Sequence, residues 1–128
     1  MLNILAVGFG GFIGSVFRYF LGLFIHSILR QSAFPYGTLS ANILGCLIIG
    51  LLSGLVDHRI ALSAPTRLFL FTGVLGGFTT FSTFGLDALR LFQADSAGDL
   101  LLAVLYVVTH VVLGLIAVYL GHWFTQLL

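Results

Sequence analysis

The third apolar run of this chain carries residues that a simple membrane-crossing helix does not need. It extends from Leu68 to about Leu91, long enough to cross a bilayer, and contains T-G-V-L-G-G-F-T-T-F-S-T-F from Thr72 to Phe84. The glycines weaken a helix, and the hydroxyl groups need hydrogen-bond partners at hydrocarbon depth. Irregular backbone is tolerated inside a membrane only against protein or water. The stretch therefore predicts an interrupted helix that lines a polar space.

Composition places the whole chain in the membrane class. Of its 128 residues, 59% are hydrophobic and only 7% are charged, whereas a soluble domain has about 25% charged residues. The net charge of +1 gives no reason to expect a nucleic-acid partner. Cys46 is the single cysteine, so an intrachain disulfide is excluded.

Four apolar spans separated by short polar loops account for nearly all of the sequence. We predict one transmembrane domain over residues 1–128, with spans at about 2–28, 38–56, 67–91 and 100–123. The first run has no basic n-region and no clear small-residue cleavage site, so it is interpreted as a retained span and not as a signal peptide. Because almost no soluble part remains, any function is expected to lie within the bilayer.

The distribution of arginines gives no preferred orientation in the membrane. With the embedded Arg18 set aside, Arg59 and Arg67 fall on one side, and Arg30 and Arg90 on the other. Cytoplasmic loops are normally enriched in Lys and Arg, and this chain has no such bias. A chain of this kind is able to insert both ways, which leads to the hypothesis of an antiparallel pair.

An enzyme is not predicted. No span offers a carboxylate pair, a Ser-His-Asp set within plausible reach, or a Cys with a His one helical turn away. A lone His110 is more simply a packed neutral histidine than a metal ligand. Every Asp falls near the end of a span, which weakens the case for a proton-coupled carrier, and Asp87 is predicted to pair locally with Arg90.

Polar residues without carboxylates suggest a path for an anion. Hydroxyl and amide donors, one arginine and the positive rims of phenylalanine rings all suit an anion, whereas a cation path would use rings of Asp or Glu. Simpler roles remain open: a hydrogen bond between helices for the Asn42 amide, core packing for the phenylalanine rings, and extension of the Arg18 side chain to the membrane interface. The predicted path consists of Arg18, Thr38, Asn42, Thr79, Thr80, Ser82, Thr83, Tyr106, Thr109 and His110, together with Phe81 and Phe84.

Three segments carry a family resemblance that covers essentially the whole chain. They are G-G-F-T-T-F-S-T-F (76–84), G-G-F-I-G-S-V-F-R-Y (10–19) and P-Y-G-T-L-S-A-N-I-L-G (35–45). With the four-span layout, they make the chain resemble the small bacterial Fluc-type fluoride channels, also called the CrcB family. The first of these segments is the most specific.

The resemblance implies an all-α membrane protein that assembles as an antiparallel, dual-topology homodimer with two fluoride pores. Such a protein exports cytoplasmic fluoride passively across the bacterial inner membrane. Phe81 and Phe84 match the pore phenylalanines of the family, and Asn42 matches the residue that orients one of those rings. Thr38 and Arg18 fall at matching positions near the pore and its vestibule.

The resemblance also implies a structural sodium ion at the dimer centre. Backbone carbonyls of Gly76 and Thr79 from both subunits would hold it. In the fourth span, where relatives often carry a serine, this chain has His110. Thr109, Tyr106 and His110 itself are the three candidates for the donor at this place. If His110 lines the pore, flux is expected to change with pH.

Two other functions are weighed against this one. A four-span, dual-topology exporter of small molecules or drugs is disfavoured because no carboxylate lies in the middle of a span. A structural or assembly subunit would have no transport activity of its own. Fluoride flux, with chloride and a lipophilic cation for comparison, separates the three.

Overall fold

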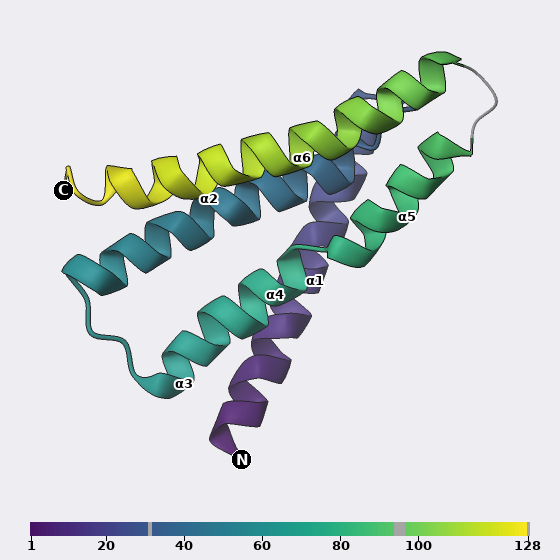
Figure 1. Ribbon diagram of the computed structural model, residues 1–128. Coiled ribbons are helices and arrows are strands. Elements are labelled where there is room, and N and C mark those ends of the chain that lie inside the picture. The colour runs from purple at the N-terminus through teal and green to yellow at the C-terminus, as the bar shows by residue number, and fades with distance from the viewer. Residues whose placement is uncertain (31, 94–96, 128) are drawn as a thin grey trace.

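The computed structural model describes residues 1–30, 32–93 and 97–127, and within these residues all regular structure is helical (Figure 1). The elements in chain order are α1 (Leu2–Ile28), α2 (Tyr36–His58), α3 (Ala64–Arg67), the π-helical segment η1 (Leu68–Leu75), α4 (Gly76–Phe78), α5 (Phe81–Phe92) and α6 (Ala97–Phe124). The segments α3, η1, α4 and α5 follow one another along a single crossing.

Four helical stretches are long and apolar enough to cross a membrane. They are Leu2–Ile28, Tyr36–His58, Ala64–Phe92 and Asp99–Phe124. The predicted all-helical fold with four spans is confirmed.

The third crossing is interrupted near its middle, as the sequence predicted. Thr79 (φ −86°, ψ 158°) and Thr80 (φ −151°, ψ 115°) adopt extended conformations between α4 and α5, and the crossing is bent by 17°. Thr80 then starts α5 as its N-cap, because its hydroxyl accepts a hydrogen bond from the Thr83 N–H at 3.2 Å. The break therefore places two neighbouring threonine peptide units outside any helix.

Glycine allows α1 to approach the first half of the third crossing closely. Gly10 and Gly14 are the buried residues of α1. A Cβ atom added to Gly10 would lie 2.9 Å from the Gly73 Cα, and one added to Gly77 would lie 2.5 Å from the Gly11 carbonyl oxygen. Backbone contact of this kind holds helices together in lipid, where apolar side chains gain little from leaving the solvent.

The helices α2 and α6 lie side by side over most of their length in Figure 1. Gly50 of α2 faces the α6 backbone at Val118, Gly54 faces Thr125 just beyond the end of α6, and Gly121 of α6 faces the α2 backbone in return. Near the N-terminal half of α6, Tyr106 and Ala103 pack with Ala88 and Leu91 of α5 to form a small buried cluster. This packing fixes the second half of the broken crossing against α6.

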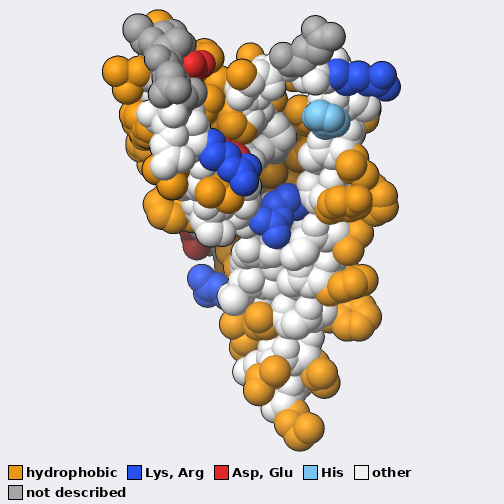
Figure 2. Space-filling model, turned by 90° about the vertical axis from the view of Figure 1, so that its right-hand side faces the viewer, with side chains coloured by type: hydrophobic (Ala, Val, Ile, Leu, Met, Phe, Trp, Pro, Cys, Tyr) orange, Lys and Arg blue, Asp and Glu red, His pale blue; other side chains and the backbone are white. Residues whose placement is uncertain are grey.

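Most large apolar side chains face outward, as expected for a surface in contact with lipid. The exception is one face on which arginine side chains gather beside a hollow, visible in Figure 2. Most of the polar residues predicted from the sequence line one of three pockets beside the third crossing.

Candidate functional site

The side-chain amide of Asn42 holds the break in the third crossing. Its Nδ2 donates to the Thr80 carbonyl oxygen at 3.1 Å, and its Oδ1 accepts from the Thr80 N–H at 2.8 Å. Asn42, a residue of α2, thus provides partners for both the N–H and the carbonyl of the extended residue Thr80. An unpaired backbone group at this depth would cost several kcal/mol, about the energy of a lost hydrogen bond in an apolar medium.

The same arrangement removes the usual helical donors from two carbonyl groups. In a continuous helix the Thr80 N–H would bond to the Gly76 carbonyl, and the Thr83 N–H to the Thr79 carbonyl. Here the first donates to Asn42 and the second to the Thr80 hydroxyl. The carbonyls of Gly76 and Thr79 are therefore left available for another partner.

A pocket of about 370 Å³ lies next to the break, and we call it the phenylalanine pocket. It is lined by Asn42, Gly45, Cys46, Ile49, Phe71, Leu75, Gly76, Thr79, Thr80, Phe81, Phe84, His110 and Val111. Both predicted pore phenylalanines, the predicted amide and His110 thus line one space. Its wall is mostly apolar, with polar groups concentrated at the break.

Four rings form a chain along this pocket and behind it. Phe84 lies 5.5 Å from Phe81, 4.5 Å from His110 and 5.6 Å from Tyr106, measured between ring centroids. Phe84 is half-buried among these rings, whereas Phe81 is 84% exposed. Phe84 is therefore held by this chain alone, and Phe81 is not covered by it.

A second pocket, the arginine pocket of about 440 Å³, lies on the other side of Thr80. It is lined by Ser15, Arg18, Tyr19, Gly22, Gly37, Thr38, Thr80 and Thr83. Arg18 is half-buried here, beside hydroxyl-bearing residues from α2 and α5. Of the two roles considered for Arg18, this position favours a side chain that faces a polar space within the protein.

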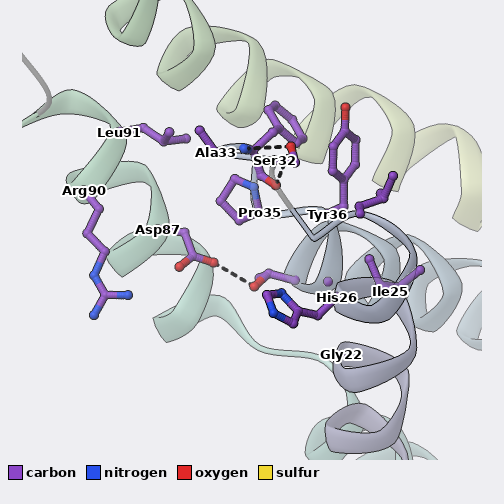
Figure 3. Close-up of a pocket in the computed structure, with 14 residues that line it drawn as sticks. Gly22, Ile25, His26, Ser32, Ala33, Pro35, Tyr36, Asp87, Arg90 and Leu91 are labelled. Atoms are coloured by element: carbon purple, nitrogen blue, oxygen red, sulfur yellow. Dashed lines mark hydrogen bonds between the residues drawn. The ribbon is translucent and has the colours of Figure 1, made fainter.

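An outer pocket of about 500 Å³ follows at the end of the bundle, between α1, the segment before α2, and α5 (Figure 3). Asp87 lies in its wall and accepts a hydrogen bond from the Thr38 hydroxyl at 2.7 Å, and another from the Tyr106 hydroxyl at 3.3 Å. The predicted Asp87–Arg90 ion pair is wrong: Figure 3 shows Arg90 directed away, and the described residues contain no such pair. The carboxylate is held by hydroxyl groups from two other helices.

The three pockets form a series because neighbours share a residue. Thr80 lines both the phenylalanine and the arginine pocket, and Thr38 lines both the arginine and the outer pocket. Ser82 is exposed, with its hydroxyl 3.4 Å from that of Thr80, and Tyr106 is fully buried behind the series. We call this series of pockets the track. Of the predicted residues, Ser82, Tyr106 and Thr109 line none of the three pockets, whereas the following do: Arg18, Thr38, Asn42, Thr79, Thr80, Phe81, Thr83, Phe84 and His110.

The ring of His110 has one nitrogen bonded and one without a partner. Its Nδ1 lies 3.1 Å from the Tyr106 carbonyl oxygen, one helical turn earlier. Its Nε2 is buried and has no hydrogen-bond partner among the described residues. Buried polar atoms are normally paired, so this nitrogen is expected to gain a partner when the pocket is occupied.

Asp87 is the residue of this track that sequence reasoning missed. It was assigned to a helix end with Arg90 because the two are three residues apart. The signal that would have found it is helical spacing, since Thr80, Thr83, Phe84 and Asp87 occur at intervals of three or four residues and share one face of α5.

The fold and the track together define a class: multi-pass membrane proteins in which a broken helix borders a polar path. Comparison with known proteins narrows this class. Residues 5–122 match the family described as CrcB-like protein, Camphor Resistance (CrcB). The chain belongs to this family, which confirms the resemblance found in the sequence.

Relatives match over nearly their full length. A fluoride-specific ion channel FluC of Chloroflexus aurantiacus is 51% identical, over 97% of this chain and 98% of its own. Another, from Agrobacterium fabrum, is 48% identical over 94% of each chain, and one from Ruminiclostridium cellulolyticum is 45% identical over 89% of this chain and 90% of its own. These relatives are named as ion channels, which are not enzymes.

The bond pair between Asn42 and Thr80 gives a direct prediction. In Asn42→Leu both peptide groups of Thr80 lose their partners, so we expect a stability loss of about 2–6 kcal/mol, since each of the two buried unpaired groups costs about 1–3 kcal/mol. The Thr80 amide should then exchange with deuterium much faster than in the wild type. Asn42→Asp is the matched variant, because a carboxylate still accepts from the Thr80 N–H but cannot donate to its carbonyl. Equal Thr80 exchange rates in the two variants would contradict this role.

Proposed function

We propose that this protein is a passive channel for fluoride. The observation that carries the proposal is near-full-length similarity to proteins named as fluoride-specific ion channels, in a chain whose predicted pore residues line connected pockets. Fluoride would pass from the outer pocket, past Arg18 and the threonine hydroxyls, to the rings of Phe84 and Phe81. An exporter of small molecules or drugs is the alternative.

The chemistry of the track suits a small anion that is strongly hydrated. Removing water from such an ion is costly unless donors are already in place along the path. The Thr83 hydroxyl accepts a hydrogen bond from the Thr80 hydroxyl and so keeps its own O–H to donate, and Arg18 supplies positive charge in the arginine pocket. Phe84 then offers the positive rim of a ring that its neighbours hold in position.

The functional unit in this proposal is an antiparallel, dual-topology homodimer with two pores. Phe81 is 84% exposed although it lies beside Phe84 and the break, and Gly76 at the break is exposed as well. Polar backbone cannot face lipid without cost, so these groups require cover from protein. A second copy in the opposite orientation suits a chain whose arginines favour neither direction.

A structural sodium ion is proposed for the centre of that dimer. The carbonyls of Gly76 and Thr79 fit this role, because the break takes away their usual N–H donors and Gly76 is exposed. Unwound carbonyls are common ligands for Na⁺ in membrane proteins. When bound, the ion would neutralise the partial negative charges of the carbonyls and join the two subunits.

The cellular site proposed is the bacterial inner membrane, where an open fluoride path lets the cell lose fluoride that entered as hydrogen fluoride. No enzymatic step is involved. The relatives' names as ion channels and the four apolar helices support this assignment.

Purified protein in liposomes should release fluoride and retain chloride. Phe84→Leu keeps apolar bulk but removes the ring rim, so fluoride efflux should fall at least about tenfold, which corresponds to a barrier higher by about 1.4 kcal/mol. Phe92→Leu is the matched control, because Phe92 is another phenylalanine of α5 but is exposed and lies outside the three pockets.

Three results would count against the channel. Uptake of a lipophilic cation without fluoride efflux would favour the exporter. No flux of any kind would favour a structural subunit. Equal fluoride efflux from Phe84→Leu and wild type would remove this ring from the path.

Dual topology can be tested because Cys46 is the only cysteine. In a Cys46→Ser background, Ala33→Cys and Ala61→Cys place exposed thiols in the first and second loops, at opposite ends of the spans. An impermeant maleimide added to intact cells should label about half of each variant. Full labelling of one variant and none of the other would establish a single orientation.

Sodium dependence is tested by the mass of the purified particle in detergent. In NaCl it should correspond to two chains. Replacing Na⁺ with N-methylglucamine should increase the fraction of single chains, because like partial charges would then face each other across the dimer centre. A dimer of unchanged stability without Na⁺ would refute the sodium site and leave the fluoride assignment intact.

A further inference from the structure

His110 is fixed in one tautomer by its own helix. The Tyr106 carbonyl oxygen can only accept a hydrogen bond, so the His110 Nδ1 at 3.1 Å must carry a proton. In the neutral ring, Nε2 then has a lone pair and no proton. This is the nitrogen that is buried without a partner among the described residues.

The neutral ring is therefore unsuited to an anion. A lone pair on Nε2 repels a halide, whereas the protonated ring offers an N–H donor and a positive charge at the same atom. The ring lies 4.5 Å from Phe84, centroid to centroid, and lines the phenylalanine pocket. Its charge state therefore acts on the part of the proposed path that has few polar groups.

The charged and titratable groups around His110 can be named element by element. Asp87 of α5 acts on the ring electrostatically, and Tyr106 of α6 lies 4.4 Å away, centroid to centroid. From α2, the Cys46 thiol lines the same pocket, and the segments η1 and α4 contribute no charged side chain to it.

We infer that His110 couples anion binding in the phenylalanine pocket to uptake of one proton by its Nε2. The inference rests on the proposed fluoride function and specifies how that site depends on pH. The proton comes from water, bonds to Nε2 and is donated in a hydrogen bond to the halide. An O–H bond of a hydronium ion breaks as the Nε2–H bond forms, and when the halide leaves the Nε2–H bond breaks and the proton returns to water.

The test is an NMR titration of the wild-type protein with ¹⁵N-labelled histidine between pH 5 and 8.5, in fluoride and in chloride at equal ionic strength. At high pH, His110 should show the Nδ1–H tautomer. Fluoride should move its titration midpoint up by about one pH unit, which corresponds to about tenfold coupling between proton and anion. His58 and His122 are internal controls, because neither lines any of the three pockets, and their midpoints should not move.

Flux provides the second readout. Fluoride efflux from wild-type liposomes should rise severalfold as pH falls through the His110 midpoint, and His110→Gln, which keeps a neutral amide donor, should give a flat profile. An Nε2–H tautomer at high pH, or a midpoint indifferent to fluoride in a protein that conducts fluoride, would overturn the inference. Absence of fluoride flux at every pH would instead refute the proposed function.

Discussion

Two hydrogen bonds from one amide side chain make the rest of this architecture possible. A helix cannot simply stop inside a membrane, because each released peptide group needs a partner that lipid does not supply. Asn42 supplies both partners for Thr80, and it comes from α2, a helix that is itself held by close glycine contacts with α6. Asn42 thus pairs the whole peptide of Thr80, whereas the carbonyls of Gly76 and Thr79 stay available for another partner.

The position of Thr80 then determines the geometry of the polar track. Its peptide is bonded on one side, while its hydroxyl caps α5 and contacts the Thr83 hydroxyl at 3.0 Å. Because α5 starts at this point, Thr83, Phe84 and Asp87 follow on one helical face. Thr80 lines both the phenylalanine pocket and the arginine pocket. The residue at the break therefore also lies between these two spaces.

The sequence predicted the parts of the site that depend on local composition, and failed where distant segments meet. Glycines and hydroxyls in an apolar run indicated the interruption, because such residues are costly in a plain span. The bond between Thr38 and Asp87 joins residues 49 positions apart, and only the packing of α2 against α5 brings them together. The family resemblance implies that Asn42 orients a ring; in the structure its side chain bonds to the Thr80 backbone, a partner that residue type alone does not reveal.

In the proposed channel, the order of polar and aromatic groups along the track suits the passage of an anion. A halide entering at the outer pocket meets a carboxylate whose oxygen is already engaged by two hydroxyl groups, so its repulsion is reduced before the anion reaches Arg18. Beyond Thr80 the wall becomes aromatic, and only ring rims, the amide and His110 remain to replace water. His110 is therefore the residue at which we expect control of anion passage. One proton on its ring changes the interaction with the anion from repulsion to attraction, while the surrounding backbone stays fixed.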